Sequence, residues 1–196
     1  SLDKGYIIAD GELSGVEIYF KISSVGATGN VLMACSNLEE EVKIINAAKE
    51  PEIVDLCNFL VKMGVRIKGI GTSTLRVLGC INHNLIDITY NIIPDRIEAG
   101  TFIMAAIITK SKIRINNIRI DHINAIIDNV KKVGCDIRIN SESSISISHN
   151  GNINSVDITT DIYPGFPTDM QAQWVALMSI SDGESFVIDS IYHDRF

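Results

Sequence analysis

Apolar and polar residues follow the same order in two stretches of this sequence, residues 41–69 and 112–140. In each, a short run of β-branched residues precedes apolar residues spaced three and four apart, which predicts a strand and then a helix with one buried face. The stretches correspond position by position at a separation of 70 residues: Asn46 with Asn116, Ile53 with Ile123, Leu56 with Ile126 and Gly64 with Gly134. A repeat of this length predicts a structural unit that occurs at least twice.

A further helix is predicted before each stretch. The first of these helices has Ser24 as its candidate N-cap and ends near Asn37, and the second begins in the charged segment at Asp95. Pro167 marks a similar start about one repeat later. Two strands follow the second helix of each unit, so the unit is expected to run helix, strand, helix, strand, strand. Such units bury each other's apolar faces, which predicts an α/β architecture.

Prolines, glycines and acidic residues indicate where the second helices begin and end. Pro51 lies in the first turn of one helix, and Gly64 is expected to end it. Asp121 is the expected cap of the equivalent helix, which Gly134 ends. Between the units, a predicted strand in "IDITYNII" runs into Pro94. We therefore place a domain crossing there, which divides the chain into residues 1–93 and 94–196.

Composition narrows the range of partners. The chain has a net charge of -7, 46% hydrophobic residues and 21% charged residues, and it has no basic stripe, so an ordered protein that does not bind nucleic acid is expected. No apolar run approaches the roughly 20 residues that span a bilayer, and the first residues lack a signal-peptide pattern. We therefore expect no membrane association and a cytoplasmic location.

The four cysteines and four histidines are dispersed, and no two cysteines form a CxxC pair. This spacing argues against a zinc site or a redox motif, so no metal ligand is predicted. Cys35 and Cys57 lie on apolar helical faces, which is typical of core packing.

Three helix starts fall at equivalent places in successive repeats: "SSVGAT", "PDRIEAG" and "FPTDMQAQ". Free backbone N–H groups and the helix dipole at such starts can hold phosphate or carboxylate. Asp169 has two interpretations, since Thr168 and Gln171 form a T-x-x-Q capping box around it, yet a carboxylate on a proline-bounded loop can also act as a general base. Arg96 either pairs with a neighbouring acid or binds an anionic substrate. Arg195 is either a surface residue or a residue that binds a ligand.

The segments "SVGATGN", "EPEIVDLCNFLVKMG", "IPDRIEAGTF", "FPTDMQAQ" and "YHDRF" resemble the UDP-N-acetylglucosamine enolpyruvyl transferases, in order and over about Leu2 to Phe196. "PTDMQAQ" and "PDRIEAG" distinguish this family from the related shikimate-pathway transferase. The resemblance implies inside-out α/β barrel repeats, with helices inside and sheets outside, and parts of two similar domains around a cleft.

The resemblance also implies the activity. Enzymes of this family transfer the enolpyruvyl group of phosphoenolpyruvate to the 3-hydroxyl of UDP-N-acetylglucosamine, release phosphate, and need no metal or organic cofactor. By this resemblance Asp169 contacts the hydroxyl as general base, Arg195 binds phosphoenolpyruvate, and Arg96 lies at the cleft. The residues implied to hold the nucleotide sugar are Ser23, Ser24, Val25, Gly26 and Ile191.

The sequence also departs from the family. Ile22 stands where the family has a nucleotide-sugar lysine, although Lys21 is adjacent. The family's amino-terminal lysine–asparagine pair, its mobile catalytic loop and its last arginine have no counterpart here, so we expect the chain to be inactive without the remainder of the same polypeptide. None of the cysteines is expected to be catalytic. Two alternatives stay open: a shikimate-pathway transferase, and a non-catalytic repeat module that binds a ligand or partner.

Overall fold

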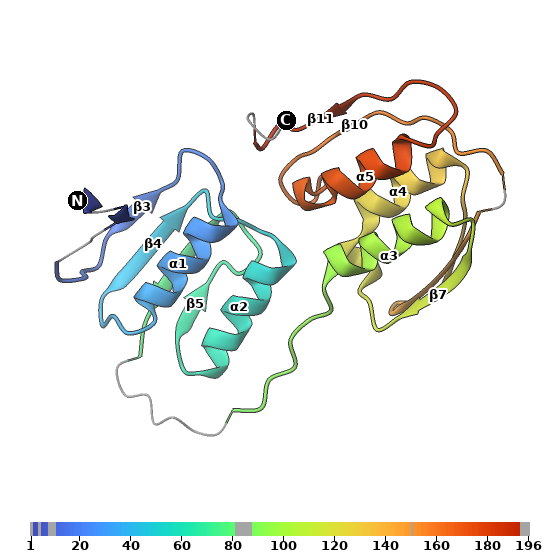
Figure 1. Cartoon of the computed structure of the whole chain (residues 1–196). Helices are drawn as coiled ribbons and strands as arrows, with labels where there is room; N and C mark the ends of the chain where they lie inside the picture. Colours follow the sequence, from blue (N-terminus) through green and yellow to red (C-terminus); the bar gives the residue numbers. More distant parts are fainter. Residues whose placement is uncertain (1, 4, 8–10, 81–87, 150, 193–196) are drawn as a thin grey trace. The chain divides into compact units, whose positions relative to one another are not determined.

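The computed structural model describes residues 2–3, 5–7, 11–80, 88–149 and 151–192 (Figure 1). The chain divides into two compact units, Ser1–Asn91 and Ile92–Phe196. The assignment of residues 1–93 and 94–196 to two enolpyruvyl transferase domains stays a prediction. No helix among the described residues is long and apolar enough to cross a lipid bilayer.

Unit 1 packs two helices on one face of a four-stranded sheet (Figure 1). Its elements are β1 (Leu2–Asp3), β2 (Tyr6–Ile7), β3 (Glu17–Tyr19), α1 (Val25–Cys35), β4 (Glu41–Ile45), α2 (Pro51–Lys62), β5 (Arg66–Lys68) and β6 (Thr74–Leu78). The sheet has the order β3-β4-β6-β5, in which β3 runs parallel to β4 and the other pairs are antiparallel.

Unit 2 gathers three helices beside a three-stranded sheet (Figure 1). Its elements are α3 (Arg96–Ile108), β7 (Lys112–Asn116), η1 (Ile120–His122), α4 (Asn124–Val133), β8 (Asp136–Ser141), β9 (Ser144–Ser148), β10 (Ile158–Thr159), the 3₁₀ turn η2 (Thr168–Met170), α5 (Gln171–Met178) and β11 (Val187–Ile188). The antiparallel sheet has the order β7-β9-β8, and β10 pairs with β11 in parallel.

The predicted repeat is confirmed in both units. Each contains helix, strand, helix, strand, strand, and in each the last strand lies between the other two. At the first strand the correspondence between the two units is shifted by one residue from the predicted pairing of Asn46 with Asn116. It is Asn117 that shares the left-handed backbone of Asn46, with φ of 56° and 60°. At the helix ends the separation of 70 holds, since Gly64 and Gly134 have φ of 102° and 99°.

Each unit has its own apolar core, as the helical periodicity predicts. The predicted stripe of α4 is almost fully buried, at Ile123, Ile126, Ile127 and Val130. Cys35 and Cys57 lie in the core of unit 1, and burial raises the pKa of the Cys57 thiol to about 11. The prediction that these cysteines pack in the core is confirmed.

Two local predictions are wrong. Asp121 does not cap α4, which starts at Asn124 without a side-chain cap; the carboxylate instead accepts two hydrogen bonds from the Arg119 guanidinium, at 3.1 and 3.2 Å. No strand occurs in residues 88–95, and Ile86 and Asp87 lie outside the described residues. Tyr90 holds this segment through its side chain, because the hydroxyl lies 2.8 Å from the Asp55 carboxylate and the ring packs edge-on against Phe59.

Candidate functional site

In unit 1, the predicted nucleotide-sugar residues lie at the start of α1. Ser24 is the N-cap, as predicted, and its hydroxyl accepts a hydrogen bond from the Ala27 amide at 3.2 Å. Val25 and Gly26 form the first turn and are exposed, while Ser23 is half-buried just before it. The first turn of α1 therefore presents backbone N–H groups that can hold an anionic or polar ligand.

Gly26 is not required by packing within the described chain. A Cβ atom built on Gly26 has no neighbour within 4 Å, and the residue does not have a positive φ. Ile22 stands where the family has its nucleotide-sugar lysine, and the structure does not test whether Lys21 replaces that lysine. Lys21 and Ile22 are both exposed, with Ile22 at 77%.

In unit 2, Asp169 lies in the 3₁₀ turn η2 that leads into α5. The predicted capping box is wrong, because neither η2 nor α5 has a side-chain cap. The side chain of Asp169 is exposed and makes no hydrogen bond or ion pair with another described residue. The turn is nevertheless anchored, since Met170 and Trp174 are 0% exposed and the Trp174 ring packs edge-on against Phe166.

The hydroxyl of Thr168 donates a hydrogen bond to Asp189 at 2.7 Å. Asp189 lies just after β11, and its other oxygen accepts hydrogen bonds from the Thr160 hydroxyl at 2.8 Å and from the backbone amides of Ile191 and Tyr192 at 2.9 and 3.0 Å. The Asp189 carboxylate thus joins the turn that contains Asp169 to the backbone of Ile191. Asp169 and Ile191 are both predicted site residues. Sequence reasoning missed Asp189, because nothing local distinguishes it from other acids near a strand end.

Two opposing effects act on the pKa of Asp189. Burial raises it, but hydrogen bonds from the two amides and the two hydroxyls outweigh burial and lower the pKa to about 2. The side chain is therefore a carboxylate at neutral pH, which suits it to accept four hydrogen bonds at once.

Arg96 is the first residue of α3, whose N-cap is Asp95. Its guanidinium carbon lies 5.6 Å from the centre of the Tyr163 ring. The two residues line a small pocket of about 120 Å³ together with the start of α4 and with Pro167, which precedes the Asp169 turn. Arg96 and the Asp169 loop therefore lie beside one pocket of unit 2.

Close packing of α3 against the Asp169 turn explains this arrangement. A Cβ atom on Gly100 would lie 2.8 Å from the Met170 sulfur, so α3 and the Met170 side chain are in close contact at this glycine. In α5, three residues after Met170, the Gln173 side-chain amide donates to the Thr101 hydroxyl of α3 at 3.0 Å.

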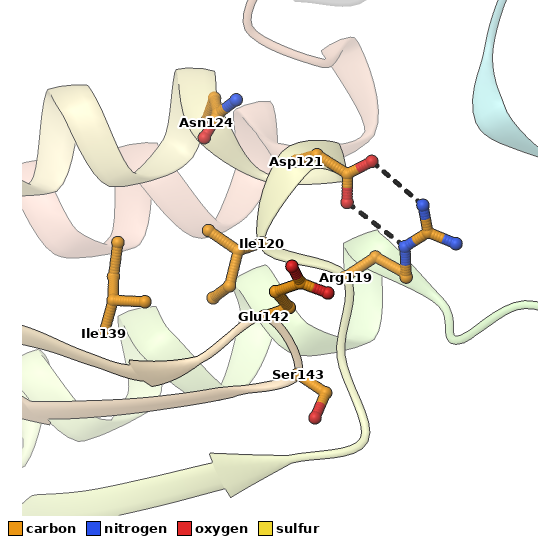
Figure 2. A pocket seen from close by; sticks show the side chains of 7 residues that line it. All are labelled: Arg119, Ile120, Asp121, Asn124, Ile139, Glu142 and Ser143. Atoms are coloured by element: carbon orange, nitrogen blue, oxygen red, sulfur yellow. Dashed lines mark hydrogen bonds and ion pairs between the residues drawn. The ribbon is translucent and has the colours of Figure 1, made fainter.

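A second hollow of unit 2, about 820 Å³, contains none of the predicted site residues (Figure 2). The paired side chains of Arg119 and Asp121 lie on one side of it, and Glu142 and Ser143, from the turn between β8 and β9, lie on another. The Arg119 guanidinium lowers the pKa of Asp121. Asp121 also lines the pocket beside Arg96, so the two hollows adjoin at this residue.

Two further expectations concern Arg195 and metals. Arg195 lies outside the described residues, so its binding of phosphoenolpyruvate stays a prediction. Among the residues that the structure describes, no three His, Cys, Asp or Glu side chains gather closely enough to hold a metal ion.

This chain belongs to the enolpyruvyl transferase family described as EPSP synthase (3-phosphoshikimate 1-carboxyvinyltransferase), whose family model matches residues 4–195. Within that class it is similar to proteins named UDP-N-acetylglucosamine 1-carboxyvinyltransferase. One, from Geotalea daltonii, is 43% identical over 197 residues, and another, from Prosthecochloris aestuarii, is 47% identical over 199. Each alignment covers 100% of this chain and 46% of the relative, so the chain spans about half the length of the curated relatives it matches.

Solved structures confirm the predicted fold class. The enolpyruvyl transferase NikO from Streptomyces tendae superposes with a TM-score of 0.76 and 19% identity, over 87% of this chain and 40% of that one. EPSP synthase from Acinetobacter baumannii superposes with a TM-score of 0.57 and 16% identity, over 90% of this chain and 40% of that one. The chain thus has a mixed α/β fold of the enolpyruvyl transferase type, and its described strands form no closed barrel.

Proposed function

We propose that these 196 residues form the central portion of a cytoplasmic UDP-N-acetylglucosamine 1-carboxyvinyltransferase. The reaction transfers the enolpyruvyl group of phosphoenolpyruvate to the 3-hydroxyl of UDP-N-acetylglucosamine for peptidoglycan synthesis, without metal or organic cofactor. Support comes from the names of the curated relatives, which align with the whole chain.

The proposed mechanism depends on the exposure of the Asp169 carboxylate and on the anchoring of its turn. Its carboxylate is exposed and makes no hydrogen bond or ion pair with another described residue, while the turn that bears it is anchored by buried Met170 and Trp174. A rigidly held carboxylate with free lone pairs can accept the proton of a sugar hydroxyl. The hydroxyl oxygen then bonds to the enolpyruvyl carbon while the neighbouring methylene carbon takes up a proton. Loss of a proton from that carbon and breakage of the bond to the phosphate oxygen restore the double bond, and phosphate leaves with the proton taken from the hydroxyl.

The other site residues have binding roles in this proposal. Ser23, Ser24, Val25 and Gly26 hold the UDP portion at the start of α1, and the backbone of Ile191 contacts the nucleotide sugar. Arg195 binds phosphoenolpyruvate, and Arg96 contributes positive charge near the reacting groups.

The test is phosphate release by the complete polypeptide that carries these residues, with phosphoenolpyruvate and either UDP-N-acetylglucosamine or shikimate 3-phosphate as acceptor. We expect turnover with the first acceptor only, and Asp169→Asn should lower kcat by about 10²- to 10⁴-fold because the amide cannot accept the proton. The control is Asp128→Asn, which changes an exposed acid on α4 whose oxygen lies 3.6 Å from the Lys131 ammonium group.

Each contrary result has a distinct meaning. Turnover with shikimate 3-phosphate alone would identify the shikimate-pathway enzyme, and no turnover with either acceptor would favour a binding module. Wild-type rates in Asp169→Asn would exclude Asp169 as the base while leaving the overall reaction intact.

A further inference from the structure

Asp189 forms hydrogen bonds with two separate parts of the proposed site, the turn that bears Asp169 and the backbone of Ile191. One carboxylate oxygen accepts the Thr168 hydroxyl at 2.7 Å, and the other accepts the amides of Ile191 and Tyr192 at 2.9 and 3.0 Å. These contacts come from two segments that are separated by about one helix and one strand along the chain. A single side chain therefore links the two segments.

The Asp189 carboxylate is itself held from a third direction. The hydroxyl of Thr160, the residue after β10, donates to it at 2.8 Å, and the same hydroxyl accepts a hydrogen bond from the Ser190 amide at 3.1 Å. Thr160 is fully buried and its amide bonds to the Ile188 carbonyl at 2.9 Å, so it is fixed to the core of unit 2. Hydrogen bonds to an ionised acceptor are stronger than neutral ones, which makes this junction well suited to fix geometry.

We propose that Asp189 is a positioning residue, which holds the turn of Asp169 and the backbone of Ile191 in the relative placement that the reaction needs. This inference rests on the proposed function, because it takes Asp169 as the base and Ile191 as a nucleotide-sugar contact. Asp189 does not touch the reacting atoms; it acts through Thr168 on one side and through two backbone amides on the other.

The two connections of Asp189 can be separated by mutation. Thr168→Val keeps the shape of the side chain and removes only the hydroxyl, so it frees the Asp169 turn and leaves the Ile191 loop attached. Thr168→Ser restores the hydroxyl. Asp189→Ala releases both segments. Thr109→Val is the matched control, because it removes a hydroxyl that donates to the Ala105 carbonyl at 2.8 Å. Thr109 lies at the C-terminal end of α3, whereas Arg96 lies at its start.

In the complete polypeptide, we expect Thr168→Val to lower kcat by about 10- to 100-fold while the KM for UDP-N-acetylglucosamine changes by less than about threefold. Thr168→Ser should recover most of kcat, and Thr109→Val should match wild type. Asp189→Ala should lower kcat and raise KM together, and adding Thr168→Val to it should cause no further loss, because both changes break the same connection.

A second measurement does not depend on turnover. Amide hydrogen exchange at Ile191 and Tyr192 in the 196-residue chain should become about 10-fold faster or more in Asp189→Ala and stay unchanged in Thr168→Val. Wild-type kcat in Thr168→Val, or unchanged exchange in Asp189→Ala, would overturn the inference. A wild-type polypeptide without turnover would overturn the proposed function instead, and the exchange rates would still decide whether Asp189 holds the Ile191 loop.

Discussion

Gly26 offers a substitution whose effects on stability and on binding should have opposite signs. It is the second residue of α1, it is exposed, and a Cβ atom there meets no atom within 4 Å. Because its φ is not positive, alanine can adopt the same backbone without strain. Alanine is favoured over glycine in a helix by up to about 1 kcal/mol. Gly26→Ala should therefore stabilise unit 1 by about 0.5–1 kcal/mol, and each kcal/mol raises Tm by about 4–8 °C in a domain of this size.

The same methyl group should weaken substrate binding. If the UDP portion lies against the backbone of Gly26, a methyl group keeps it from its contact distance, and a tenfold rise in Kd corresponds to about 1.4 kcal/mol. Gly29→Ala is the matched control in the same helix, since its Cβ would lie 3.7 Å from a Leu56 methyl and 3.8 Å from an Ile53 methyl, which is ordinary contact distance. It should stabilise α1 similarly and leave Kd unchanged.

Two assays decide the matter. Urea unfolding of the 196-residue chain, followed by circular dichroism, measures stability, and calorimetric titration of the complete polypeptide with UDP-N-acetylglucosamine measures Kd. A destabilised Gly26→Ala would mean that the first turn of α1 is not as described. Equal Kd values for wild type, Gly26→Ala and Gly29→Ala would refute the assignment of Gly26 to the nucleotide-sugar site.

Two further predictions concern unit 2. Gly100→Ala would place its Cβ 2.8 Å from the Met170 sulfur and 2.9 Å from an Ile126 methyl, so these two buried side-chain ends must shift, and overpacking should cost up to about 1–3 kcal/mol; an unchanged urea midpoint would show that they shift without cost. Asp189 has its pKa lowered from 3.8 to about 2 in the folded chain, so its carboxylate stabilises the fold above about pH 4 and this contribution is lost as the pH falls towards 2. The difference in unfolding free energy between wild type and Asp189→Ala should therefore shrink over that interval, and a difference independent of pH would exclude the ionised carboxylate as its source.

The sequence predicted those features of the fold that depend on neighbouring residues. Ser24 caps α1 because its hydroxyl reaches an amide three residues on, and Gly64 and Gly134 end their helices because the left-handed backbone suits glycine. The buried stripe of α4 followed from spacing alone. The start of α1 was therefore predicted as a candidate site with its cap correctly placed.

The predictions that failed are those in which a polar side chain has a partner that local sequence does not select. Asp121 was expected to cap α4, but it pairs with Arg119 in the turn before the helix. Thr168 was expected to cap the helix after Asp169, but it donates to Asp189, which lies 21 residues further along the chain. At Asp121 the Arg119 guanidinium competes successfully with the free amides of a helix start, because a charge-assisted hydrogen bond is the stronger one.

The three equivalent helix starts then differ in a way that bears on chemistry. At α1 and α3 the start is capped, by the Ser24 hydroxyl and by the Asp95 carboxylate, which accepts the amides of Ile97 and Glu98 at 2.7 and 3.2 Å. At the third start no side chain caps the helix. One carboxylate oxygen of Asp95 is occupied by the amides of its own helix. Packing and the Thr168–Asp189 hydrogen bond hold the Asp169 turn in place of a cap, which leaves the carboxylate oxygens of Asp169 available to a substrate hydroxyl.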